Sequence, residues 1–217
     1  MSATVCSRRV VLLGSVISLA AVLPAAGCST VGTLVYLINP NDVPAEYDGL
    51  RGKHVAVVCR PIVELQFSDA GSARELARTV GRDLERNLRR TRVISQQEVA
   101  RWVDENERLD YATLGRSLDA DLVVGIDLEG FRLYEGSTLY RGTASALLKV
   151  YDIAEGTVVF EKRLDDFSFP KDSAIPTSDR SEPQFRGMFI QVLAGRIARC
   201  FYPHDSRTHF AEENLTY

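Results

Sequence analysis

The sequence predicts a single α+β domain behind an export signal. Strand and helix patterns alternate between residues 54 and 118, and three strand patterns follow between 122 and 164 before a last helix. The predicted order is β-α-β-α-β-β-β-α, with a mixed sheet of about five strands and the helices packed on one face. We assign residues 1–27 to a signal peptide, 28–50 to a tether, 51–203 to the domain and 204–217 to a polar tail.

Residues 1–27 have the three parts of an export signal. Arg8 and Arg9 form a positive start, an apolar stretch covers positions 10–23, and small residues precede Cys28. This stretch resembles a bacterial lipobox, in which the cysteine is acylated and the chain is cut just before it. Ala25 stands where leucine is usual. The resemblance implies lipid attachment at Cys28 and a domain held at a membrane of the cell envelope.

An uncleaved membrane anchor and a soluble secreted protein are the alternatives. Residues 10–27 carry no charge over 18 positions, near the lower limit for a spanning helix. Pro24 and two glycines within them favour a cleaved signal, and a soluble secreted protein needs no cysteine at the cut. The arginine pair also resembles a twin-arginine signal, but the general export route is favoured. Under the sorting rule of Gram-negative lipoproteins, Ser29 in place of aspartate favours the outer membrane, with the domain in the periplasm.

Composition argues against a nucleic-acid binder. The formal net charge is −3, and it becomes −5 once Arg8 and Arg9 are removed with the leader. Nucleic-acid-binding domains are normally basic. The remaining 190 of the 217 residues suffice for one domain with a sizeable core.

The first half of the domain alternates strand and helix. An uninterrupted apolar run within 54–61 is typical of a strand buried on both faces. Apolar residues every four positions predict a helix over 72–90, and Ser72 with Glu75 predicts a capping box at its start. A short strand at 93–95, a helix capped by Ser95 and containing Trp102, and a short helix through 114–118 follow.

The second half is predicted as two consecutive antiparallel hairpins. Apolar residues alternate with mixed residues over 122–129, 144–151 and 158–165, and the connections between these strands are short. A Ser/Pro-rich loop spans 167–182. Ser181 then caps a final helix with Pro183 in its first turn, and Pro203 ends it.

Two groups of charged residues are candidates for function. One is an anion-facing stripe along the 72–90 helix that would meet phospholipid head groups or an acidic partner, although an ordinary solvated face is favoured: Arg74, Arg78, Arg82 and Arg86. The other lies on the outer face of the predicted sheet: Asp127, Glu129, Lys149, Glu161 and Arg163. Cross-strand ion pairs explain this second group better than acid–base catalysis.

The cysteines and histidines predict little chemistry. Cys59 and Cys200 are the pair that could form a disulfide in an oxidising compartment, and two buried free thiols are the alternative. His54, His204 and His209 do not form a metal-binding pattern. We expect neither a metal nor a cofactor.

Three segments resemble a group of envelope lipoproteins. They are residues 93–99 (VISQQEV), residues 114–125 (LGRSLDADLVVG) and residues 150–159 (VYDIAEGTVV). The group includes the penicillin-binding-protein activator, the curli secretion lipoprotein and the N-terminal domain of the Tol translocation protein. The resemblance spans roughly 54–202 and implies an α+β domain with a mixed sheet and no enzyme active site.

The leading hypothesis is a membrane-anchored, non-enzymatic lipoprotein that binds or regulates an envelope protein or assembly. The alternative is a homo-oligomeric component of a secretion or transport complex. Pore formation is disfavoured, because the loops at 134–138 and 167–182 are too short or too polar for a membrane hairpin. A hydrolase is the least favoured class.

Overall fold

A computed structural model describes residues 42–61, 66–106 and 110–207. The proposed leader, Cys28 and most of the proposed tether lie outside these ranges, and so do His209 and the end of the tail. The chain divides into two compact units at Pro40/Asn41, and only the second unit is described below.

The main sheet is mixed, as the sequence predicts. Its strand order is β3-β2-β4-β5-β6. β2 (His54–Pro61) runs parallel to both β3 (Arg92–Val93) and β4 (Leu122–Glu135). β4, β5 (Leu139–Asp152) and β6 (Thr157–Phe169) form the two predicted antiparallel hairpins, and β7 (Ile175–Pro176) pairs with β5.

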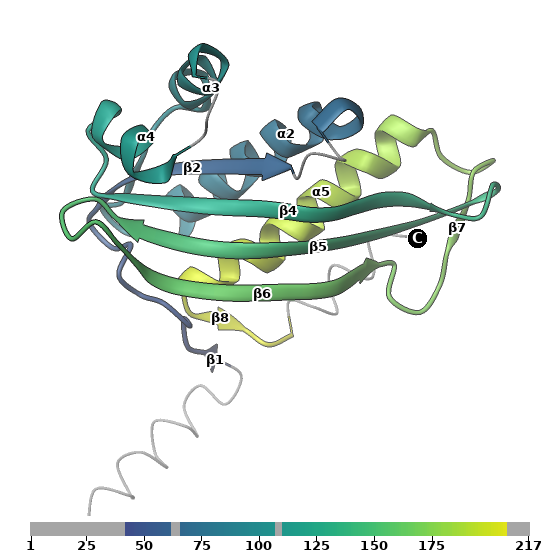
Figure 1. Ribbon diagram of the computed structural model, residues 1–217. Helices are drawn as coiled ribbons and strands as arrows, with labels where there is room; N and C mark the ends of the chain where they lie inside the picture. Colours follow the sequence, from purple (N-terminus) through teal and green to yellow (C-terminus); the bar gives the residue numbers. More distant parts are fainter. Residues whose placement is uncertain (1–41, 62–65, 107–109, 208–217) are drawn as a thin grey trace, which may run out of the picture. The chain divides into compact units, whose positions relative to one another are not determined.

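Two helices cover one face of this sheet. α2 (Gln66–Asn87) and α5 (Glu182–Ala198) lie side by side behind the strands in Figure 1. α2 places Leu76, Val80 and Leu84 in the core, each at most 1% exposed. α5 contributes Phe185 and Phe189, which are fully buried. The predicted periodicity of both helices is therefore their core-facing side.

Two shorter helices pack on the other face, over β2 and β4. They are α3 (Gln96–Glu105) and α4 (Tyr111–Ser117), and a second, smaller apolar cluster lies beneath them. Val58, Leu114 and Val123 belong to it. The predicted placement of the helices on one face therefore describes α2 and α5, whereas α3 and α4 cover one end of the opposite face (Figure 1).

The cap predicted for the start of α3 is confirmed, and the cap predicted for α2 is wrong. Ser95 caps α3 as predicted, since its Oγ accepts a hydrogen bond from the backbone N–H of Glu98 at 3.3 Å. Asp110 caps α4 through its bond to the backbone N–H of Thr113 at 2.9 Å. The capping role predicted for Ser72 is wrong. α2 begins six residues earlier at Gln66, and Ser72 lies buried inside the helix.

The residues just before β2 pack on the domain. β1 (Asp42–Val43) pairs with β8 (His204–Asp205), which follows a short 3-10 helix, η3 (Arg199–Phe201). The backbone N–H groups of Glu46 and Tyr47 donate to the carbonyl oxygen of Cys200, at 2.9 and 3.0 Å. Leu50 is fully buried. Both ends of the described chain are thus joined to the same edge of the fold.

Candidate functional site

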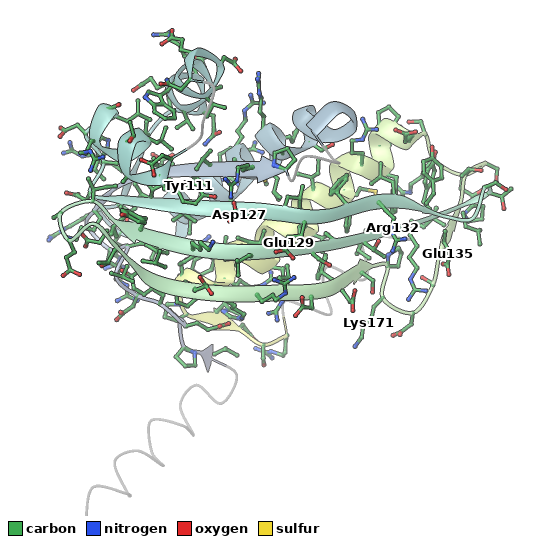
Figure 2. The ribbon with its side chains drawn as sticks, in the orientation of Figure 1. Tyr111, Asp127, Glu129, Arg132, Glu135 and Lys171 are labelled. Atoms are coloured by element: carbon green, nitrogen blue, oxygen red, sulfur yellow. The ribbon has the colours of Figure 1, made fainter. Side chains whose placement is uncertain are left out.

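The charged residues of β4, β5 and β6 share the sheet face that α2 and α5 leave uncovered. Asp127 lies opposite Leu147, which in turn lies opposite Arg163, and Lys149 lies opposite Glu161. Figure 2 shows this face toward the viewer and labels Asp127 and Glu129, which belong to β4. We call the part of it beyond α4 the open face. The outer-face group was therefore placed correctly from the two-residue period of the strands.

Asp127 is the centre of a polar network on this face. Its side chain is 9% exposed, yet its carboxylate has three partners. Arg60 of β2 reaches Oδ1 at 2.8 Å, Lys149 of β5 reaches Oδ2 at 3.3 Å, and the hydroxyl of Tyr111 donates to Oδ1 at 2.5 Å. A buried carboxylate is stable when several donors satisfy it. The network therefore ties β2, β4, β5 and α4 together.

Gly125 makes room for the tyrosine of this network. A Cβ at this position would lie 2.6 Å from the Tyr111 ring, so only glycine lets the ring rest on β4. The Arg60 guanidinium lies 5.8 Å from the centre of the same ring, within the range of a cation–π contact. Burial and the bond to Asp127 raise the pKa of Tyr111, so its hydroxyl remains a donor near neutral pH.

Glu129 is held from the neighbouring strand. Both of its oxygens accept hydrogen bonds from Arg163, and Arg163 also donates to Asp165 at 2.8 Å. Asp127 and Glu129 thus each face cations. This is the cross-strand pairing that the sequence predicts, and it differs from a pair of free carboxylates arranged for acid–base work.

Beyond these pairs, two shallow hollows lie between residues of β4, β5 and β6, toward the tip of the β4–β5 hairpin. They measure about 470 and 100 Å³. Arg132, Thr143 and Asp166 line both, and Arg132 donates to the hydroxyl of Thr143 at 3.4 Å. We call these hollows with their lining the distal hollow; Figure 2 labels Arg132, Glu135 and Lys171 in this region.

The rim of the distal hollow is held by polar contacts. Arg141 pairs with Glu135 at 3.5 Å and donates to the carbonyl oxygen of Lys171 at 2.8 Å, which links β5 to the segment after β6. Tyr134 donates to a carboxylate oxygen of Glu182, which connects the tip of β4 to α5. Acidic and basic side chains therefore line the rim of the distal hollow, and their contacts join β4 and β5 to α5 and to the segment after β6.

The predicted arginine stripe lies along the exposed side of α2. Arg74 pairs with Asp104 of α3 at 2.5 Å, Arg86 lies 3.9 Å from Asp83, and Arg82 donates to Thr79. Arg78 is exposed. These contacts are those of a solvated helix face, and an anion-facing role for Arg74, Arg78, Arg82 and Arg86 stays a prediction.

Cys59 and Cys200 are free thiols in different surroundings. Cys59 lies in β2, where burial and the nearby Asp127 raise its pKa. Cys200 is buried in η3; burial raises its pKa and its thiol faces the carbonyl oxygen of Arg196 at 3.8 Å. A disulfide between them stays an untested prediction.

The Asp127 network and the distal hollow were not predicted as sites. Asp127 was placed on the correct face, but Arg60 and Tyr111 were not connected with it. Arg60 is 67 residues away from Asp127 in the sequence, and only the parallel register of β2 and β4 brings them together. The alternation in β2 puts Arg60 on the face of Ala56 and Val58, which is the one sequence signal that was available.

Comparisons with known proteins find partial likenesses in structure alone. No protein-family model matches the chain, and no curated protein matches it. Among solved structures, the PelC dodecamer from Paraburkholderia phytofirmans has 13% identity and a TM-score of 0.44, covering 74% of this chain and 96% of that chain. The lipoprotein GNA1162 from Neisseria meningitidis has 14% identity and a TM-score of 0.42, covering 67% and 97%.

The LpoB C-terminal domain from Salmonella enterica is also similar, with 14% identity and a TM-score of 0.38, covering 55% of this chain and 86% of that chain. At these scores and identities the likenesses assign neither a family nor an activity. Within the part of the chain that the structure describes, no helix is both long and apolar enough to cross a membrane.

Proposed function

We propose that this protein is a bacterial lipoprotein, acylated at Cys28, whose periplasmic domain binds or regulates another envelope protein without catalysing a reaction. The leader and the cysteine after its small residues support the anchor. Two or more acyl chains hold a protein stably at a membrane, since each buried CH₂ contributes about 0.8 kcal/mol.

The open face with the distal hollow is the observation that carries the binding role. Cations and carboxylates lie next to one another there, and Arg132 is exposed beside Asp166. Such a mixed pattern offers electrostatic complementarity to the charge pattern of another protein. The hollow is shallow and lined mainly by polar side chains, whereas sites for small molecules are usually lined mainly by apolar ones.

The way in which the acidic groups are held supports a non-catalytic role. Asp127 accepts bonds from Arg60, Lys149 and Tyr111, and these partners occupy its oxygens. Glu129 is paired with Arg163. A general base needs a free lone pair that faces a substrate. In the described residues these two carboxylates instead contribute to the shape and charge of the open face.

Crosslinking in the protein's own membrane tests the binding role. A photoreactive amino acid at Thr143, in the distal hollow, is expected to capture a defined envelope protein, and one at Arg101 on the exposed side of α3 is not. Arg132→Glu should lower the Thr143 crosslink at least tenfold, whereas Arg101→Glu should leave it unchanged. Equal capture at both positions, or no effect of Arg132→Glu, would refute the proposal.

Fractionation tests the anchor separately. Cys28→Ala is expected to release the protein from the membrane fraction if Cys28 carries the acyl chains. Retention of this variant at the wild-type level would contradict lipid attachment at this residue, whatever the crosslinking result.

A homo-oligomer is a second candidate, favoured by the edge strand β6. This strand has 13 residues and ends the sheet order, and Val158 and Val159 at its start are 46% and 36% exposed. An uncovered strand edge can pair with the same edge of another copy. Native mass spectrometry of the full chain in detergent should then show oligomers that Val158→Lys dissociates. A monomer at micromolar concentration would exclude this candidate.

A further inference from the structure

Two exposed turns bring together cations that are far apart in the sequence. The backbone N–H of Arg92 donates to the carbonyl oxygen of Lys53 at 3.0 Å. The hydroxyl of Thr91 donates to the carbonyl oxygen of Leu50 at 2.9 Å. These bonds dock the segment after α2 against the turn before β2. The exposed residues that result form what we call the basic corner: Arg51, Lys53, Arg89, Arg90 and Arg92.

The basic corner is not neutralised by its surroundings. None of its five side chains has an ion pair within 4.0 Å among the described residues. Asp48 is the acidic residue of the same turn, and its carbonyl oxygen accepts a bond from the Arg51 backbone. The carboxylate of Asp121 also lies beside the corner, since it accepts a bond from the backbone N–H of His54 at 2.7 Å. Five cations with the carboxylates of Asp48 and Asp121 give a local charge of +3 on a chain whose net charge is −3.

A structural role explains only part of this corner. Cations near the C-terminal end of α2 interact favourably with the helix dipole, which accounts for Arg89 and Arg90. Arg51 and Lys53 belong to a different turn, and like charges placed close together repel. Along α2 itself, the arginines alternate with Glu75, Asp83 and Glu85. The corner lacks this alternation, so it matches an external anionic surface better than solvent.

We infer that the basic corner docks on anionic phospholipid head groups and thereby orients the domain on its membrane. This inference rests on the proposed anchor at Cys28. Cys28 precedes Asp42 by 14 residues, and at about 3.6 Å per residue this segment spans at most about 50 Å. The anchor therefore keeps the corner within reach of the lipid surface. Screening confines the attraction to about 8 Å, so the corner must lie at the surface itself.

Energy transfer on lipid nanodiscs tests the inference with the full mature protein. A donor dye is attached at Asn87→Cys beside the basic corner, or at Ser137→Cys in the turn between β4 and β5. The acceptor dye is carried on a lipid head group. On discs with 30% phosphatidylglycerol we expect stronger transfer from position 87 than on neutral phosphatidylcholine discs. Transfer from position 137 should not increase, and 1 M salt should abolish the difference.

Matched charge variants complete the design. The corner variant replaces four cations by glutamine: Arg51, Lys53, Arg90 and Arg92. The control variant replaces four exposed cations elsewhere: Arg78, Arg101, Arg116 and Lys171. Each basic residue near an anionic surface contributes about fivefold to binding. Four such residues together contribute about 600-fold, so the corner variant should lower the docked-to-undocked ratio by about this factor and the control variant by less than about fivefold.

The outcomes separate the inference from the anchor on which it rests. Retention on neutral discs reports the anchor, and the extra transfer on anionic discs reports the corner. Equal transfer on both discs, or equal losses in the two variants, would overturn the inference even if the anchor holds. If the chain leaves neutral discs but is recruited to anionic ones through the corner, the corner binds lipid and the anchor proposal fails.

Discussion

Replacing Asp127 with alanine is expected to destabilise the domain strongly, because this carboxylate satisfies groups from three other elements. The change removes the acceptor of the Tyr111 hydroxyl, which lies half-buried under α4. It also removes the shared partner of Arg60 and Lys149. We expect α4 to lose its attachment to β4 first, since Tyr111 is its first residue.

The magnitude follows from the exposure of each partner. An unsatisfied buried donor costs about 1–3 kcal/mol, which applies to the Tyr111 hydroxyl. The side chains of Arg60 and Lys149 are 47% and 26% exposed, so water can replace much of their interaction. Each adds at most about 1 kcal/mol. The free energy of unfolding should therefore fall by about 3 kcal/mol, a large share of the 5–15 kcal/mol typical of a domain.

Denaturation of the full chain in detergent, followed by the fluorescence of the single tryptophan, measures this loss. Trp102 packs against the same small cluster as Tyr111 and reports its opening. The control is Glu129→Ala, whose partner is a surface arginine, and this variant should stay close to wild type. Tyr111→Phe should be non-additive with Asp127→Ala by about 1–2 kcal/mol. A loss below about 1 kcal/mol for Asp127→Ala, or full additivity, would refute the network.

Three further expectations follow. Gly142→Ala should cost about 1–3 kcal/mol in unfolding free energy, because its Cβ would clash with the buried phenyl ring of Phe189 in α5, whereas Gly187→Ala meets no neighbour and should not destabilise. Asp110→Ala should cost about 0.5–1 kcal/mol at pH 7. The hydrogen bond from the Thr113 hydroxyl lowers the pKa of Asp110 in the folded protein. The stabilisation by this cap is therefore present above about pH 4 and is lost as the pH falls through the folded pKa. Denaturation at a series of pH values should show the difference in unfolding free energy between wild type and variant closing over that range. Cys59 and Cys200 should react slowly with maleimide in the folded protein and fully after denaturation without reductant; peptide mapping that finds them joined would establish the disulfide instead.

The sheet could be predicted because its signals are local. The two-residue alternation survives in the burial of the β5 side chains, and the turn at Gly156 has the positive φ of 70° that glycine adopts easily. In β4 the residues 122–128 are all buried, because α4 packs on the other face of this end of the strand. The predicted strands were too short, since β4 and β5 continue to the tip of their hairpin at Glu135 and Leu139. Those extensions carry the distal hollow, so underestimating the strands also hid the site.

Contacts between distant segments could not be predicted in the same way. Gly71 and Ser72 are typical helix-start residues, but α2 already begins at Gln66 and Ser72 lies buried within the helix, so tertiary burial outweighs the local signal. The basic corner has the same origin. Arg89 and Arg92 follow the α2 stripe directly in the sequence, whereas Arg51 and Lys53 join them only through the pairing of β2 with β3.

The pairing of β1 with β8 has a practical consequence for probing this protein. It places the described chain's entry at Asp42 beside its exit near Asp205, so the two ends emerge together (Figure 1). A reporter protein joined to the chain near Asp205 would therefore lie beside the entry at Asp42. Insertion at the hairpin tip near Ser137, which is exposed, keeps the reporter away from both ends. Internal fusion at this tip is thus the better design for following the protein in living cells.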